Sequence, residues 1–301
     1  MTTHKRRQTD KKTPVNEKLQ NEKLQKVLAR AGYGSRREME TAILEGRINI
    51  NGHLAKLGDR VTSTDKILID GKLFKIVKDH RTRLLLYNKP EGEICTRSDP
   101  QGRPTVYDRL PVIKNERWIS VGRLDINTSG LLLFTNDGNL AHHLMHPASN
   151  IDREYMVRIH GKVDEAMKQR LLKGVMLEDG HACFTDIASG EEGQGSNRWF
   201  YCVIMEGRNR EVRRLWESQQ VKVSRLKRVR FGSLFIPSHV RSGQWLELDG
   251  NAIRDLCKTA GIEPPKAEQP LTRSEQEKYR RQLRKLRAGK MRQIHHVKRA
   301  R

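Results

Sequence analysis

One segment of the chain, residues 122–138 (GRLDINTSGLLLFTNDG), places an arginine and a carboxylate just ahead of an apolar run. Arg123 and Asp125 precede the apolar residues 131–134, which predicts a loop that leads into a buried strand. A carboxylate presented to a cleft in this way can act as a nucleophile or as a general acid or base. Beside a Thr-Ser-Gly bend it can equally be an ordinary turn residue, so this segment alone leaves both interpretations open.

Two later segments carry further reactive side chains. Residues 153–157 (REYMV) begin a predicted strand on which Tyr155, Val157 and Ile159 share one face. Residues 206–215 (EGRNREVRRL) lead into a predicted helix with a cluster of guanidinium groups and an apolar stripe. A tyrosine on such a strand can be an ordinary core residue, whereas a guanidinium fork can hold a carboxylate through two hydrogen bonds.

Together these three segments resemble the motifs of the ribosomal small-subunit-type family of pseudouridine synthases. The upstream segments 88–92 (NKPEG) and 102–111 (GRPTVYDRLP) also resemble this family, and the resemblance extends over about residues 22–260. It implies an isomerase that detaches uracil from C1′ of ribose, turns it and rejoins it through C5. Because this reaction involves no redox change, the resemblance implies no cofactor.

The resemblance also implies a role for each matching residue. Asp125 would be the catalytic carboxylate, either attacking covalently or assisting a glycal-type intermediate, and Arg213 would be its guanidinium partner. Tyr155 would pack on the target base and help to remove the C5 proton; on its own it could be a core tyrosine. Arg123 would fill the space left when the uridine flips out, and Leu215 would line the base pocket.

The third segment departs from the family pattern at residues 210 and 211, where Arg-Glu stands in place of the His-Gln pair of many relatives. Arg213 keeps its register, so its expected role is unaffected. Arg210 and Arg214 lie close enough on the same helix to be alternative partners for the carboxylate.

Near the N-terminus, residues 22–37 (EKLQKVLARAGYGSRR) and 45–52 (EGRINING) resemble an S4 domain, which binds structured RNA. The spacing predicts helices that begin near Leu24 and after Ser35, the second opened by a capping box with Glu38. The basic residues expected to contact RNA here are Lys26, Arg30, Arg36, Arg37 and Arg47. Without the resemblance, a solvated basic face would be the simpler interpretation.

The fold expected is α+β: a small S4 domain of two helices and a short sheet at residues 22–78, then a mixed, largely antiparallel sheet with flanking helices at 83–262. Residues 1–21 are expected to form a disordered basic arm, and 263–301 a basic, disordered tail.

The chain of 301 residues carries a formal net charge of +23, which favours a polyanionic partner. We expect this partner to be 23S rRNA or a large-subunit assembly intermediate, bound by a monomer in the cytoplasm. No apolar run is long enough to span a membrane. The four cysteines form no C-x-x-C pair, and no metal is expected: His142 and His146 have helical i, i+4 spacing but lack a third ligand.

Three alternatives stay open. The same chemistry could act on 16S rRNA, or the chain could be a non-catalytic ribosome-assembly factor that binds RNA. A glycosidase with a pair of carboxylates would need a second acid beside Asp125, and the turn around Asp137 already explains that residue.

Overall fold

The computed structural model describes residues 21–74, 81–192 and 197–264. The expected basic arm at 1–21 and tail at 263–301 lie outside these ranges except at their inner edges.

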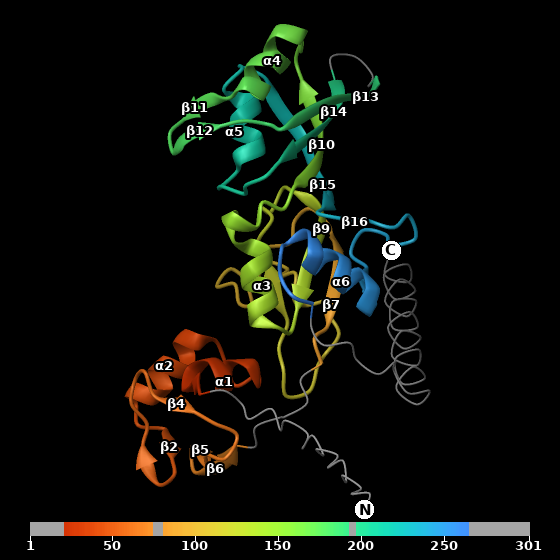
Figure 1. Cartoon of the computed structure of the whole chain (residues 1–301). Helices are drawn as coiled ribbons and strands as arrows, with labels where there is room; N and C mark the ends of the chain where they lie inside the picture. The colour runs from red at the N-terminus through yellow and green to blue at the C-terminus, as the bar shows by residue number, and fades with distance from the viewer. Residues whose placement is uncertain (1–20, 75–80, 193–196, 265–301) are drawn as a thin grey trace, which may run out of the picture. The chain divides into compact units, whose positions relative to one another are not determined.

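The N-terminal part contains the two predicted helices, α1 (Leu24–Arg30) and α2 (Arg36–Leu44) (Figure 1). The predicted capping box opens α2: the Ser35 hydroxyl accepts from the Glu38 amide at 3.1 Å, and the Glu38 carboxylate accepts from the Ser35 amide. Apolar side chains of both helices pack with Ile48 and Ile67 of the adjoining sheet in one core. The small α+β module expected from the sequence is confirmed.

The strands of this part form two small sheets. A four-stranded sheet has the order β3-β2-β5-β6, and β1 pairs with β4. Their bounds are β1 (Glu22–Lys23), β2 (Ile48–Ile50), β3 (His53–Leu54), β4 (Arg60–Val61), β5 (Ile67–Ile69) and β6 (Lys72–Phe74).

The rest of the described chain is built on one mixed sheet with the order β13-β14-β10-β15-β9-β7-β17, to which β8 and β16 add at the sides. Its strands are β7 (Leu84–Lys89), β8 (Ile119–Val121), β9 (Ser129–Thr135), β10 (Arg153–His160), β13 (Asp186–Glu192), β14 (Asn197–Ile204), β15 (Lys222–Phe231), β16 (Leu234–Phe235) and β17 (Trp245–Glu247). A separate hairpin joins β11 (Val175–Leu177) to β12 (Gly180–Ala182).

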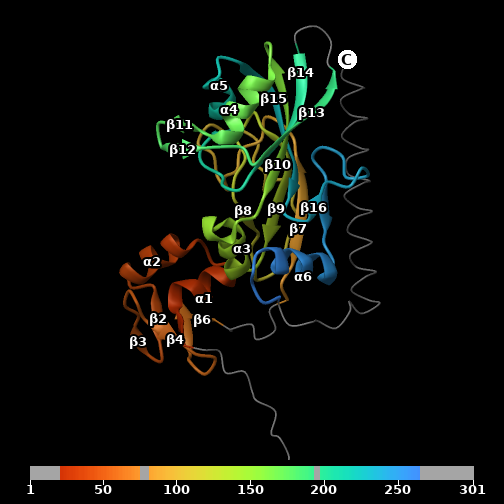
Figure 2. The ribbon, with the colours of Figure 1, turned by 45° about the horizontal axis from the view of Figure 1, so that its top comes forward.

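Helices cover both halves of this sheet. α4 (Glu165–Lys173) and α5 (Glu211–Glu217) lie beside the β10–β14 half, and α3 (Gly138–Met145) and α6 (Gly250–Thr259) lie beside the β7–β9 half (Figures 1 and 2). A short 3-10 helix, Pro147–Ser149, follows α3. Strands β7 and β9 are buried on both faces, since their alternate side chains belong to two different apolar cores.

The two halves of the sheet join at a short parallel pairing of β9 with β15, in which Gly130 lies opposite Arg228. Gly130 has φ +106°, and a Cβ built on it would lie 2.8 Å from the Arg228 amide nitrogen and closer still to the Arg228 carbonyl oxygen. Only glycine fits this close approach of two backbones. The glycine of the Thr-Ser-Gly segment is therefore required where the predicted catalytic loop meets the second half of the sheet.

Substituting this glycine tests the junction. Gly130→Ala should lower the free energy of unfolding by about 2–4 kcal/mol, because it adds backbone strain and a steric clash. Gly102→Ala is the control: Gly102 also has a positive φ, +67°, but has no neighbour within 4 Å. It should cost only about 1 kcal/mol. Urea denaturation of both variants measures the difference, and equal losses would contradict the role of the close approach.

Candidate active site

The loop between β8 and β9 carries Asp125 and is fixed through its main chain by Lys89. This lysine, at the end of β7, is fully buried, and its ammonium donates to the Pro90 carbonyl at 3.0 Å. It also donates to the carbonyls of Asp125 at 3.1 Å and Thr128 at 2.8 Å, the two ends of the turn. Three N–H groups are all that an ammonium has, so each one is used.

Arg213, at the start of α5, reaches the same loop from the other half of the sheet. Its guanidinium donates to the carbonyl of Asn127 at 2.9 Å and to that of Val223 at 3.1 Å. Among the residues that the structure describes, no ion pair joins Arg213 to the Asp125 carboxylate, so the expected two-pronged contact is not formed here. Burial lowers the pKa of Arg213, as does the charge of Arg210, whereas the charge of Asp125 raises it.

The loop's remaining carbonyls are also held. The Cys95 thiol donates to Leu124 at 3.2 Å, and the Gly92 amide donates to Ile126 at 2.8 Å. All five consecutive carbonyls of residues 124–128 therefore accept a hydrogen bond. A loop fixed in this way presents its carboxylate in a set position, as a reacting group requires.

Two buried cations interact electrostatically with the half-buried Asp125 side chain. Burial lowers the pKa of Lys89, and among the charges that act to raise it is that of Asp125. Asp125 acts in the same direction on Arg213. The charge of Asp125 thus interacts favourably with both cations, an arrangement that suits a nucleophile or an electrostatic stabiliser.

Tyr155 and Leu215 belong to one apolar core. Tyr155 on β10 is 7% exposed, and Val157 and Ile159 on the same face are fully buried, which confirms the predicted shared face. Leu215 is fully buried in the same core. Its expected apolar stripe with Val212 is confirmed, whereas a base pocket at Leu215 stays a prediction.

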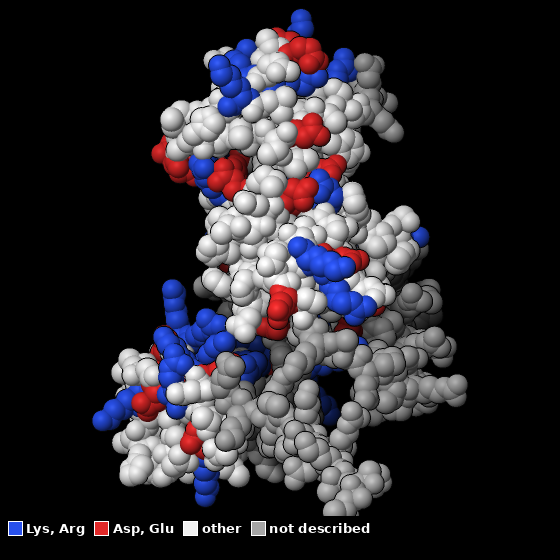
Figure 3. Space-filling view, viewed as in Figure 1, with Lys and Arg blue, Asp and Glu red and all other residues white. Residues whose placement is uncertain are grey.

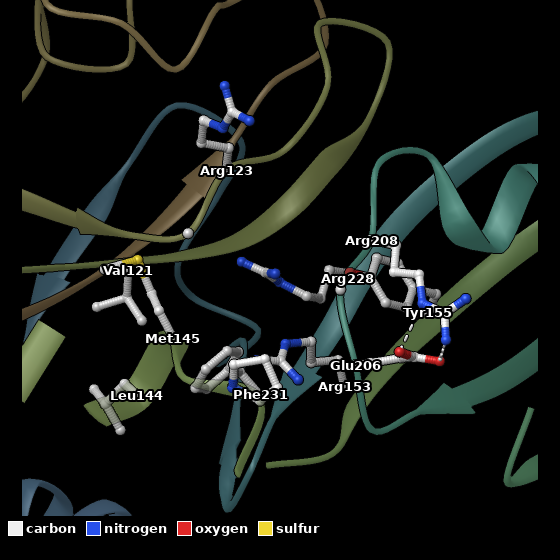
Figure 4. Close-up of a pocket in the computed structure, with 13 residues that line it drawn as sticks. Val121, Arg123, Leu144, Met145, Arg153, Tyr155, Glu206, Arg208, Arg228 and Phe231 are labelled. Atoms are coloured by element: carbon white, nitrogen blue, oxygen red, sulfur yellow. Dashed lines mark hydrogen bonds and ion pairs between the residues drawn. The ribbon is translucent and has the colours of Figure 1, made fainter. Parts of the chain in front are cut away.

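A cavity of about 270 Å³ adjoins Tyr155 and is lined by Arg123, Arg153, Arg228 and Phe231, among others. In Figure 4 the Arg123 side chain points away from the other side chains, and it is exposed. An exposed arginine on a fixed loop is free to enter a nucleic acid, as its predicted role requires. Asp125, Arg213 and Leu215 are not part of the cavity lining.

The first residue of α5 carries a buried carboxyl that the sequence analysis did not single out. Glu211 is 2% exposed and accepts from the Arg208 amide at 2.9 Å. Burial, opposed by the hydrogen bond from the Arg208 amide and assisted by the neighbouring Glu206 carboxylate, raises the pKa of Glu211 to about 7. Arg208 binds Glu206 through two hydrogen bonds of 2.8 and 2.9 Å.

The basic residues predicted to contact RNA in the N-terminal part differ in their partners. Lys26 and Arg30 form ion pairs with Glu22, at 3.7 and 2.8 Å. Arg47 binds Asp70 through two hydrogen bonds of 2.7 and 2.8 Å. These three charges are therefore partly compensated within the protein.

Arg36 and Arg37, in the first turn of α2, are exposed, and no ion pair is found for them within the described ranges. Blue side chains gather over the region of α1 and α2 in Figure 3. The start of a helix adds amide donors to these guanidiniums, an arrangement that suits a phosphate.

The described residues contain no group of three or more His, Cys, Asp or Glu side chains placed to bind a metal ion. His142 and His146 contact one another, with ring centroids 5.5 Å apart. Within the same ranges, no helix combines the length and the apolar character needed to cross a bilayer.

Comparison with protein families agrees with this fold. The RNA pseudouridylate synthase family matches residues 83–218, and the S4 domain matches residues 22–77. A crystal structure of a pseudouridylate synthase superposes with a TM-score of 0.54 at 25% identity, covering 78% of this chain and 99% of that one. The chain belongs to the RNA pseudouridine synthases that carry an S4 domain, as the sequence predicted.

Its relatives narrow the class. The chain is 56% identical over 276 residues to the ribosomal large subunit pseudouridine synthase B of Pseudomonas aeruginosa, covering 91% of this chain and 71% of that protein. It is 55% identical over 246 residues to the protein of the same name from Shigella flexneri, with coverages of 79% and 84%.

The sequence analysis assigned no role to Lys89, which holds the Asp125 loop, or to Arg153 and Arg228, which line the cavity. A lysine that ends an apolar strand, as Lys89 does, is a signal that could have been followed, because a buried ammonium needs several acceptors. Arg153 and Arg228 stand among many other arginines of this chain, and only the fold distinguishes them.

Lys89 offers a direct test of how the loop is held. Lys89→Met keeps the length of the side chain but removes its three N–H donors, so the Pro90 and Thr128 carbonyls lose their buried partner. The free energy of unfolding should fall by about 1–3 kcal/mol. The exposed Lys162→Met should change it by less than about 0.5 kcal/mol in the same urea titration. Equal effects of the two variants would contradict the assignment.

Glu211 predicts a pH dependence of stability. Its raised pKa means that the folded state binds the proton more tightly than the unfolded state does. The contribution of Glu211 to the free energy of unfolding is therefore fully present below pH 4.5 and is lost as the pH rises to about 7. Glu211→Gln keeps an acceptor for the Arg208 amide and cannot ionise. The variant's stability relative to wild type should rise across this window and level off above it. Thermal denaturation over the pH range measures this, and a flat difference would contradict it.

Proposed function

We propose that this chain isomerises one uridine of 23S rRNA to pseudouridine, as the large-subunit name of its relatives indicates. The observation that carries the proposal is the Asp125 loop, in which the carbonyls of residues 124–128 all accept hydrogen bonds and whose carboxylate interacts electrostatically with two buried cations. The product is of the pseudouridine 2605 type. The enzyme works as a monomer in the cytoplasm, on 23S rRNA or a large-subunit assembly intermediate.

In this reaction the bond from C1′ to N1 of uracil breaks and a bond from C1′ to C5 forms. The proton that leaves C5 is balanced by the one that N1 gains, so the chain's own side chains suffice and no cofactor is required. Asp125 acts on the sugar–base bond, and Tyr155 lies against the flipped base near C5. Arg213 holds the loop through Asn127 and supplies positive charge beside Asp125.

Recognition of the substrate is divided between the two parts of the chain. Arg123, exposed on the Asp125 loop, occupies the space that the flipped uridine leaves in the RNA. Leu215 lines the base site once the substrate has opened the core around it. The S4 part binds structured RNA through Lys26, Arg30, Arg36, Arg37 and Arg47, with Arg36 and Arg37 the most available.

Asp125→Asn tests the proposal. The substitution keeps the size of the side chain and removes its charge, so turnover should fall on the order of 10⁴-fold or more, while RNA binding stays close to that of wild type. The readout is site-mapped pseudouridine on 23S and 16S rRNA from cells that lack the gene, complemented with each variant.

Asp137→Asn is the matched control, because Asp137 belongs to the same segment and caps α3 by accepting from the amides of Asn139 and Leu140. Asparagine caps a helix equally well, so activity should be retained. One 23S uridine lost without the gene and restored by wild type and Asp137→Asn, but not by Asp125→Asn, is the result expected. A 16S uridine would overturn the substrate, and no lost uridine would point to an assembly factor.

A further inference from the structure

A patch of four side chains forms one wall of the cavity beside Tyr155. Tyr155 lies directly across from Arg228, and Arg153 directly across from Phe231, in the pairing of β10 with β15. A register shift between Glu154 and Tyr155 places an extra residue of β15 in this stretch. Bulges of this kind turn side chains, and here Arg228 and Phe231 face the cavity together.

The two arginines of this patch are buried cations held close together. Arg153 is 8% exposed and Arg228 is 3% exposed. Their guanidinium carbons lie 5.2 and 5.4 Å from the centre of the same Phe231 ring. Burial lowers the pKa of Arg153, and among the charges that act on it Arg228 lowers it as well, which is the repulsion expected of two neighbouring cations.

Both cations donate to backbone carbonyls, although the charges of Glu211 and Asp152 also act on Arg153 and raise its pKa. Arg153 uses one nitrogen to donate to the carbonyls of Ile151 and Met205, and Arg228 Nε donates to Leu131. Arg228 Nη2 is buried with no hydrogen-bond partner in the described structure. Over the described ranges, neither guanidinium forms an ion pair with a carboxylate.

The other charged groups of the wall do not change this balance. The Glu206 carboxylate also lines the cavity, but both its oxygens accept from Arg208. In Figure 4, dashed lines join Glu206 to Arg208. The Arg228 side chain extends from β15 toward the middle of the view. Two buried positive charges without a counter-ion are costly, so the cavity is built for an anion.

We propose that this cavity binds a phosphodiester group of the substrate RNA next to the target uridine, with Arg228 and Arg153 as its donors. The inference rests on the proposed function, because Tyr155 borders both the cavity and the expected position of the target base. A volume of about 270 Å³ admits a phosphate with part of its ribose, whereas one water takes about 30 Å³. Phe231 keeps the two guanidiniums stacked and oriented.

The test uses a series of RNA stem-loops that the wild-type enzyme modifies, each with one phosphate replaced by a neutral methylphosphonate at a different position, and measures the affinity of the enzyme for each RNA. At one linkage beside the target uridine, loss of the charge should weaken binding by about tenfold or more, because a charge-assisted pair of hydrogen bonds is lost. In Arg228→Gln, binding of the unmodified RNA should already be weaker, and the same linkage should have little further effect. Arg228→Lys should recover part of the loss.

Arg153→Gln provides a second variant that leaves the Arg228 contact with Leu131 in place, and it should lose sensitivity to the same linkage. Arg158→Gln is the control: it lies on the same strand and removes the same charge, but its guanidinium binds Ser224 outside the cavity. It should keep the full wild-type response to every linkage. Thermal denaturation identifies any variant that fails to fold.

The proposal is overturned if no linkage loses its effect in both Arg228→Gln and Arg153→Gln. A second result would also overturn it: inorganic phosphate raises the melting temperature of wild type but not of the arginine variants, while every methylphosphonate weakens RNA binding equally in wild type and variants. The cavity would then hold free phosphate. Both outcomes are separate from a failure of the proposed function, since the series uses an RNA on which wild-type turnover has first been measured.

Discussion

The site depends on one close approach of two backbones. At Gly130 and Arg228 the two halves of the sheet join through a short parallel pairing, with no space for a side chain on the glycine. The Asp125 loop ends at this point, so the junction fixes where the loop leaves the sheet. It also fixes where α5 and Arg213, from the second half, can reach the loop. A shift of the junction would separate the carboxylate from its cations, even if each half kept its own core.

The cations near Asp125 hydrogen-bond to backbone carbonyls and not to the Asp125 carboxylate. All three N–H groups of Lys89 donate to backbone carbonyls, and two nitrogens of Arg213 donate to the carbonyls of Asn127 and Val223. Because these bonds are made without substrate, the positive charges are already oriented when a transition state develops nearby. Preorganised charge of this kind stabilises a developing anion without any reorganisation of the site.

The sequence predicted the elements with regular apolar spacing and failed where the sheet is irregular. The strands β9 and β10 and the helices α1, α2 and α5 were expected in the segments where they are observed, since their apolar residues repeat at strand or helix periods. The ten-residue strand β15 was missed. Its basic residues hide the alternation, and two register shifts against β10 interrupt it. For α6, the Asp249 cap and the spacing of Ile253, Leu256 and Cys257 were a signal that could have been followed.

The same irregularity explains which site residues could be found in advance. Asp125, Tyr155 and Arg213 lie in segments whose residue types and order can be recognised from the sequence alone. Arg228 acquires its place only through a bulge, and nothing in its neighbours separates it from Arg225 or Arg230. Whether an arginine is free to bind an anion therefore depends more on its ion-pair partners than on the net charge of the chain. Arg230 is paired with Asp152 and Glu154, and Arg47 with Asp70. Arg228, in contrast, has a buried nitrogen with no hydrogen-bond partner in the described structure. A strongly basic chain carries many arginines, and those that line a cavity without an ion-pair partner are the ones that a bound anion can stabilise most.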